Sequence, residues 1–152
     1  MRDDKELTPD QALAKMEHYC GYRERCPQEV RQKMARLGVK GETAEQIYRV
    51  LEGEGYINEA RFARAFASGK FRVNRWGRIR IRLELQRRAI APGLIEAALA
   101  EIDEQEYFNV LQELLAKKLK QYRAGKDPLA NRKAAAALIR AGFEPELVFQ
   151  RL

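Results

Sequence analysis

The chain has 152 residues, a formal net charge of +7, and a hydrophobic content of 45%. This length and composition favour a single domain with a buried core, and the positive charge indicates an anionic partner. No run approaches the roughly 18 uncharged apolar residues of a membrane span, and the first residues lack the apolar core of a signal peptide. Two cysteines are too few for a disulfide scaffold. We therefore expect a cytoplasmic protein that contacts no membrane.

The first part of the chain contains the signals of three helices. Thr8-Pro9-Asp10-Gln11 combines a capping threonine, a proline at the first helical position and a glutamine that bonds back, which predicts a helix start. Pro27 opens a second helix, and Gly38 is placed to end it with a positive φ. Thr43-Ala44-Glu45-Gln46 reads as a second capping box, which predicts that a third helix begins there.

Further helices follow in the same way. Gly53 and Gly55 end the third helix, and Asn58 caps the next one. Asp103-Glu104-Gln105-Glu106 caps a longer helix, and Asp127-Pro128 opens another. These signals predict helices on both sides of residues 78–85.

Residues 78–85 are ambiguous, because charged and apolar residues alternate there as in a half-buried strand. Internal repetition favours a helix. A shift of 51 residues pairs Val30 with Ile81, Met34 with Leu85, and Gly38-Val39 with Ala89-Ile90. A third copy lies in residues 131–143, where four consecutive alanines suit a helix far better than a strand.

The repetition predicts an all-α fold of three tandem three-helix repeats. Units of roughly 45 to 50 residues normally stack into an elongated, curved array in which each unit contacts its neighbours. We place the repeats at residues 1–55 (with an N-terminal tail), 56–102 (the basic repeat) and 103–152. An array of this kind offers a long surface instead of a deep pocket.

The positive charge is concentrated in residues 56–90, where ten basic side chains face two acidic ones, for a net charge of +8. The rest of the chain sums to −1. A solvated helix face is one interpretation. The second is a binding surface, because acidic partners within the segment are nearly absent and like charges such as Arg78 and Arg82 repel each other. The candidate binding residues are Lys70, Arg72, Arg75, Trp76, Arg78, Arg80, Arg82 and Arg87.

Two aromatic residues, Phe71 and Trp76, are interleaved with these basic residues. Such an arrangement can stack nucleic-acid bases while cations neutralise phosphates. Alternatively, both rings pack the junction between two helices. The sequence leaves both interpretations open.

Nothing in the sequence indicates catalysis. His18, Cys20 and Cys26 do not have the spacing of a common zinc site, and no fourth ligand is apparent. Gly53 and Gly55 lack the lysine of a phosphate-binding loop. We therefore expect no catalytic residue, no metal and no cofactor.

A longer motif contains Gly55, Tyr56, Ile57, Asn58, Glu59, Ala60, Arg61, Phe62 and Ala63. This segment resembles the signature of the RecX regulatory proteins, and the resemblance continues through Gly77-Arg78-Ile79-Arg80, Leu85 and Ile90. Relatives often carry arginine where this chain has Trp76, and glycine where it has Ala89. The resemblance extends over nearly the whole chain.

The resemblance implies three tandem three-helix repeats, no enzymatic activity, and a monomer that binds the RecA recombinase or its DNA filament. Its implied effect is to modulate, most simply to inhibit, the recombinase, ATPase and coprotease activities of RecA in DNA repair, recombination and the SOS response. The alternative is a helical protein that binds single- or double-stranded DNA directly through residues 70–88. A plain helical scaffold is the third hypothesis.

Overall fold

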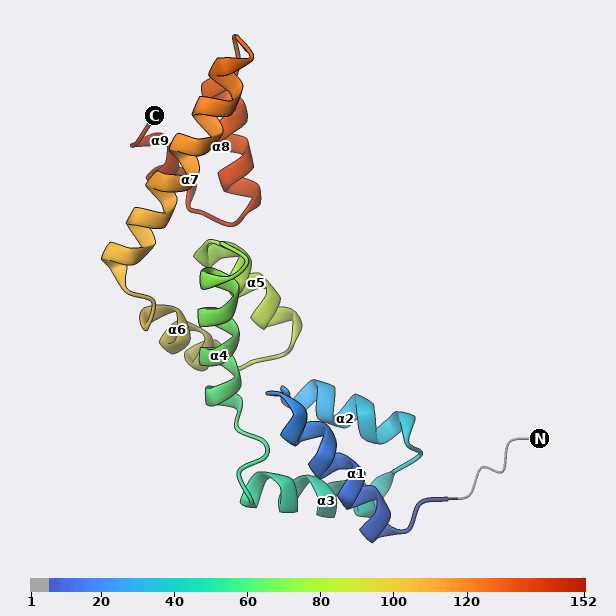
Figure 1. Ribbon diagram of the computed structural model, residues 1–152. Coiled ribbons are helices and arrows are strands. Elements are labelled where there is room, and N and C mark those ends of the chain that lie inside the picture. The colour runs from blue at the N-terminus through green and yellow to red at the C-terminus, as the bar shows by residue number, and fades with distance from the viewer. Residues whose placement is uncertain (1–5) are drawn as a thin grey trace, which may run out of the picture. The chain divides into compact units, whose positions relative to one another are not determined.

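In a computed structural model of the protein, residues 6–152 are described, and every regular element in this range is an α-helix (Figure 1). The helices are α1 (Pro9–Tyr22), α2 (Pro27–Arg36), α3 (Gly41–Gly53), α4 (Glu59–Arg72), α5 (Arg78–Arg87), α6 (Pro92–Ala100), α7 (Glu104–Ala124), α8 (Ala130–Arg140) and α9 (Pro145–Phe149). None of those helices is both long and apolar enough to cross a membrane. The predicted class of tandem helical repeats is confirmed.

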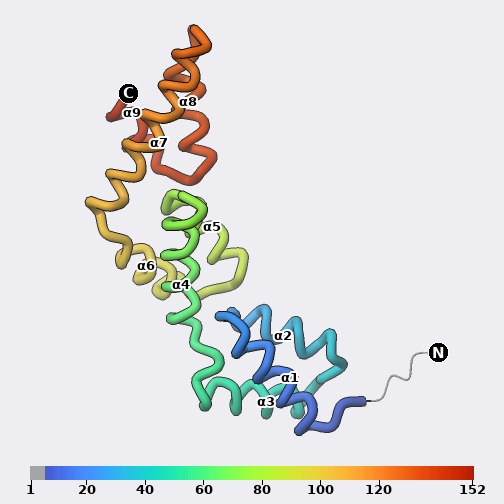
Figure 2. The backbone as a smooth tube through the Cα atoms, in the orientation of Figure 1, coloured from blue at the N-terminus to red at the C-terminus, as the bar shows by residue number. Residues whose placement is uncertain are grey.

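The chain separates into two compact units, which meet in sequence between Phe62 and Ala63. The first unit holds α1 to α3 and the start of α4, and the second holds the remainder (Figure 2). The repeat boundaries at residues 55 and 102 stay a prediction. The start of the predicted N-terminal tail, residues 1–5, lies outside the described residues.

The core of the first unit is built from one apolar stripe on each of three helices. Met16 on α1, Val30 on α2 and Leu51 on α3 are fully buried, and Ile57 extends the same cluster beyond α3. Cys20 belongs to this cluster too, so it acts as a small buried hydrophobic side chain, as predicted. Burial in this core also raises the pKa of the Cys20 thiol.

The same helix ending occurs three times. After α2, α5 and α8 the chain turns through Gly38, Ala89 and Gly142, whose φ angles are 76°, 57° and 103°. The next residue is buried, and its N–H donates to a carbonyl in the last turn of the helix: Val39 to Met34 (2.9 Å), Ile90 to Leu85 (3.2 Å), Phe143 to Leu138 (3.1 Å). This agreement supports the repeat alignment.

Ala89 therefore keeps the left-handed conformation although it is not a glycine. That conformation costs an L-residue roughly 1–2 kcal/mol. Burial of Ile90, which is 4% exposed, helps to offset the cost.

Residues 78–85 form the greater part of α5, so the strand interpretation of this segment is excluded. Ile81 and Leu85, four residues apart, are fully buried, whereas Leu83 is 49% exposed. A strand would bury Leu83 on the same side as its neighbours. Helical periodicity thus decides which apolar residues enter the core.

Two predicted helix starts were wrong. The first hydrogen bond of α3 runs from Ala44 N–H to Lys40 O (3.3 Å), so the helix begins at Gly41 and Thr43 lies inside its first turn. Helix α8 begins at Ala130, beyond the predicted Asp127-Pro128. The Asp127 carboxylate accepts from Leu129 N–H (2.9 Å), so it organises the turn before the helix.

Tyr107 lies at the centre of the second unit's core and is fully buried. Its ring stacks on Phe71 (centroids 5.6 Å apart) and contacts Phe143 (5.3 Å). Its hydroxyl accepts from Arg78 N–H (3.1 Å) and donates to the Glu144 carboxylate. Burial, with the Glu144 hydrogen bond, raises the pKa of Tyr107 above its ordinary value, so the hydroxyl stays protonated as a donor.

Two glycines allow the turn before α5 to touch the turn after α8. Gly77 N–H donates to Ala141 O (2.8 Å), and Ile79 N–H donates to Gly142 O (2.9 Å). A Cβ added at Gly77 would collide with the backbone of Gly142, and one added at Gly142 would collide with Arg80. This contact joins α5 to the last two helices of the same unit.

Gly77→Ala is expected to lower the free energy of unfolding by about 1–3 kcal/mol, because the added methyl group forces the two backbones apart. Gly69→Ala is the control, since Gly69 lies inside α4 with open space around its Cβ position. The control should raise the free energy of unfolding by about 0.5–1 kcal/mol. Urea denaturation measures both, and equal stability of Gly77→Ala and the parent would contradict the contact.

Tyr107→Phe keeps the ring and removes the hydroxyl, which leaves the Arg78 N–H and the Glu144 carboxylate without this partner. The expected loss of stability is about 1–3 kcal/mol. Tyr122→Phe on the same helix is the control, because Tyr122 lies only partly buried near the end of α7. Thermal unfolding in which the two variants behave alike would show that the buried hydroxyl is not structurally important.

Candidate partner-binding surface

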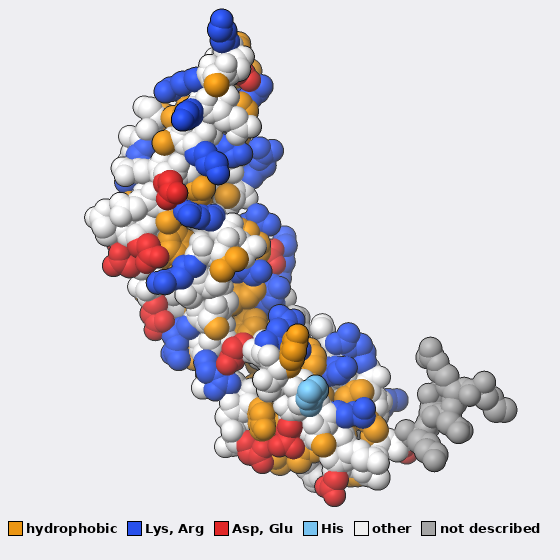
Figure 3. Space-filling view, viewed as in Figure 1, with side chains coloured by type: hydrophobic (Ala, Val, Ile, Leu, Met, Phe, Trp, Pro, Cys, Tyr) orange, Lys and Arg blue, Asp and Glu red, His pale blue; other side chains and the backbone are white. Residues whose placement is uncertain are grey.

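The predicted binding residues lie at the end of α4, in the following turn and on α5, all within the second unit. We call this set the basic belt: Lys70, Arg72, Arg75, Trp76, Arg78, Arg80, Arg82 and Arg87. Arg75 adopts a left-handed conformation (φ 58°) in the turn. Figure 3 shows basic side chains in blue with acidic ones in red among them.

Most arginines of the belt are paired with glutamates, and all but one of these glutamates lie outside residues 56–90. The acidic partners come mainly from α6 and α7, which follow the belt in the chain. The pairs are Arg72–Glu106 (3.5 Å), Arg75–Glu113 (3.3 Å), Arg78–Glu104 (3.4 Å), Arg78–Glu144 (2.9 Å), Arg82–Glu96 (2.7 Å) and Arg87–Glu84 (2.8 Å). The sequence shows a signal for this that we missed, namely the acidic residues between 96 and 113.

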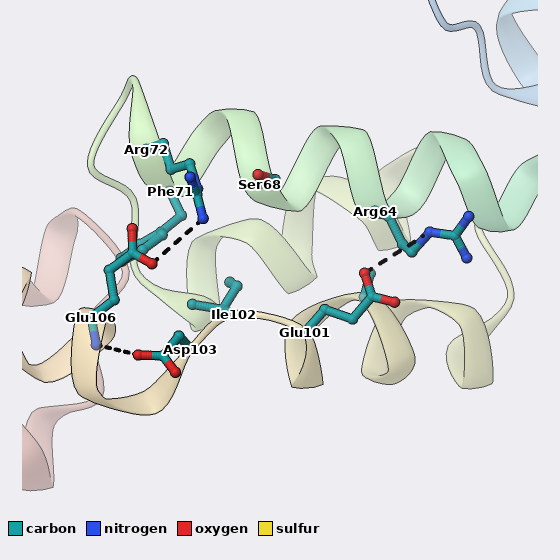
Figure 4. Close-up of a pocket in the computed structure, with 9 residues that line it drawn as sticks. Arg64, Ser68, Phe71, Arg72, Glu101, Ile102, Asp103 and Glu106 are labelled. Carbon is teal, nitrogen blue, oxygen red and sulfur yellow. Dashed lines mark hydrogen bonds and ion pairs between the residues drawn. The ribbon is translucent and has the colours of Figure 1, made fainter.

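Figure 4 shows how α4 faces the segment between α6 and α7. Arg64 lies 3.9 Å from Glu101, and Arg72 reaches Glu106. Asp103 points back to cap α7, accepting from Glu106 N–H (2.8 Å). The pocket between these residues has a volume of about 90 Å³. That is far below the roughly 300–1,000 Å³ of ligand sites, so we assign it no ligand.

The pairs differ in how tightly they are formed. Arg82 holds both oxygens of Glu96 (2.7 and 3.2 Å), and this hydrogen bonding lowers the pKa of Glu96. Arg78 is 20% exposed, and its Nε lies beside Glu144 as an ion pair without an aligned hydrogen bond. Glu113, the partner of Arg75, is 66% exposed. Exposed pairs of this kind are worth only about 0–1 kcal/mol and weaken with salt.

Two cations of the belt differ from the rest, because neither Lys70 nor Arg80 forms an ion pair within residues 6–152. Both lie over the ring of Trp76 instead, at 5.0 Å for Lys70 Nζ and 4.0 Å for Arg80 Cζ from its centroid. The half-buried Trp76 also meets Phe66 edge-on (6.4 Å). We call Lys70, Trp76 and Arg80 the Trp76 cluster. Phe71, by contrast, is buried against Tyr107, so it has a packing role.

The signature residues around position 58 hold the chain between α3 and α4. Gly55 is left-handed (φ 80°), and Asn58 caps α4 by accepting from Arg61 N–H (2.9 Å). The Arg61 guanidinium donates to Gly55 O (2.8 Å) and to Glu24 (2.6 Å). Ile57, Phe62 and Ala63 are buried, Tyr56 is partly buried, and Glu59 lies in the first turn of α4. The motif therefore has a structural role in these contacts.

The residues considered for a metal site lie apart from the belt. Cys20 and Cys26 are both buried, and His18 is exposed on α1. No group of three or more histidine, cysteine, aspartate or glutamate side chains is arranged to hold a metal ion in the part of the chain that is described.

Two family models match the chain from the end of the first unit through the second unit. The model of the second three-helix domain of RecX matches residues 58–99, and that of the third three-helix domain matches residues 104–152. Together they span more than half of the chain.

Whole-chain comparisons agree with these matches. The regulatory protein RecX of Amycolatopsis mediterranei is 26% identical over 95% of this chain and 85% of its own length, and that of Prosthecochloris aestuarii is 29% identical over 93% and 91%. The crystal structure of RecX from Lactobacillus salivarius superposes with a TM-score of 0.84 at 19% identity, covering 99% of this chain and 96% of that one. The chain belongs to the RecX family of regulatory proteins.

Proposed function

We propose that this protein binds the RecA–DNA filament in the cytoplasm and restrains the recombinase, ATPase and coprotease activities of RecA. Membership of a family of regulatory proteins supports a regulatory role. The observation that carries the proposal is the Trp76 cluster, since Lys70 and Arg80 are held beside an aromatic ring without an ion pair in the described residues. Cations in that position remain available to an anionic partner.

The paired arginines can join the same binding surface if the partner's anionic groups replace their glutamates. An anionic partner must displace a glutamate from each of them, and an exposed pair costs at most about 1 kcal/mol to open. Arg72 and Arg75, whose glutamates lie 3.5 and 3.3 Å away, are the easiest to recruit. Arg78 is held by Tyr107 and Glu144 in the core, so we assign it to the fold and not to the partner.

Direct DNA binding is a second candidate, and the Trp76 cluster favours it as well. Cations held beside an indole ring can neutralise phosphates of the DNA backbone. The two functions are compatible, because a RecA filament presents protein and DNA together. They differ in whether bare DNA is sufficient for binding.

The test is charge reversal of the two cations, Lys70→Glu with Arg80→Glu, in the full chain. We expect at least about ten-fold weaker binding to RecA filaments on single-stranded DNA, because repulsion replaces attraction at the anionic partner. Fluorescence anisotropy of labelled protein measures the affinity, and DNA-dependent ATP hydrolysis by RecA measures the effect. Binding by the parent should also weaken as salt rises.

Lys40→Glu with Arg49→Glu is the matched control, since both side chains are exposed, at the start of α3 and on α3 in the other unit, and the pair undergoes the same change in net charge. Loss of affinity in both variants alike would show a general charge effect. If the parent leaves ATP hydrolysis and strand exchange by RecA unchanged at equimolar amounts in low salt, the proposed function is wrong. Tight binding of bare DNA with a salt slope of several units identifies the second candidate.

A further inference from the structure

A groove on the first unit lies between α1 and α2, remote in sequence from the basic belt. It has a volume of about 580 Å³, within the size range of ligand sites. Its lining residues are Ala14, Lys15, His18, Tyr19, Tyr22, Arg25, Lys33 and Leu37. The family signature and the belt contribute none of them.

The wall of this groove is fixed in place by one buried arginine. Arg25 is only 8% exposed, its guanidinium lies 3.8 Å from the centroid of the Tyr19 ring, and its Nε donates to Tyr19 O (3.1 Å). Glu29, 3.7 Å away, balances its charge. Lys33 Nζ lies over the same ring at 5.5 Å. The groove is thus preformed, which lowers the entropy cost of binding.

The charges that border the groove have one sign. Lys15 and Lys33 line it together with Arg25, and no carboxylate is among the lining residues. Neither lysine forms an ion pair in the part of the chain that the structure describes. Tyr22 lies beside them, and 78% of its surface is exposed. Among the described residues, no other large aromatic side chain is more exposed. Aromatic side chains are enriched at protein interfaces, and lysines without an internal partner attract acidic groups.

We propose that this groove binds an acidic peptide segment of a protein partner, with one aromatic or aliphatic side chain of the segment against Tyr22, Leu37 and Ala14. Carboxylates on either side of that anchor would meet Lys15 and Lys33. The apolar lining favours a peptide over a nucleic acid. The Tyr19 ring is already covered by Arg25 and Lys33, so only Tyr22 is left to stack a base. This inference does not depend on the proposed function of the belt.

The test uses the isotope-labelled full chain and a panel of short synthetic peptides. Each peptide carries one phenylalanine or leucine among glutamates, and the position of this apolar residue differs from peptide to peptide. Matched peptides carry glutamine in place of glutamate, and an oligothymidylate serves as the nucleic-acid probe. Amide chemical shifts measured by NMR report both the affinity and the residues affected. We expect acidic peptides to shift amides of the groove and to bind at least about ten-fold more tightly than the glutamine peptides.

Two variants locate the site. Lys15→Glu with Lys33→Glu should weaken binding of the acidic peptides at least about ten-fold, and Tyr22→Ala should weaken it at unchanged charge. Arg49→Glu, outside the groove, should leave it unchanged. The proposal is overturned if no acidic peptide shifts the groove amides, if the groove variants bind like the parent, or if the oligothymidylate occupies the groove and the peptides do not.

Discussion

The backbone contact between Gly77 and Gly142 determines where the arginine-bearing helix α5 begins and which residues lie beside it. Because neither glycine has a side chain, the start of α5 donates two hydrogen bonds, from Gly77 and Ile79, to the end of α8 and the turn after it. This contact places Arg78 over Tyr107 and next to Glu144. The hydrogen bonds of the buried tyrosine then join α5, α7 and the start of α9 into one core.

The same packing gives most arginines of the basic belt a glutamate partner within the protein. Helices α6 and α7 bring Glu96 and Glu113 to Arg82 and Arg75, so most arginines of the belt are paired internally, whereas Lys70 and Arg80 form no ion pair in the described residues. Such pairs limit repulsion between neighbouring arginines when no partner is bound. In the proposed binding, these pairs also reduce non-specific attraction to polyanions, since a partner has to displace several glutamates.

Local signals predicted most of the fold, and long-range packing explains what they missed. The Thr8 cap and the turn at Gly38 are encoded within a few residues, so both were predicted correctly. Helix α5 needed the internal repeat, because its alternating charges resemble a strand. The acidic partners were missed because Arg75 and Glu113 are separated by 38 residues along the chain. Only the packing of α7 brings them together.

The most direct test removes the glutamates that compete with an anionic partner for the arginines of the belt. Glu96→Gln with Glu113→Gln keeps the side-chain shapes and releases Arg82 and Arg75. Glu45→Gln, which opens the exposed Arg31 pair on the other unit, is the control. We expect the double variant to bind RecA filaments on single-stranded DNA with a several-fold lower dissociation constant, and the control to bind like the parent. Unchanged or weaker binding by a folded double variant would contradict this expectation.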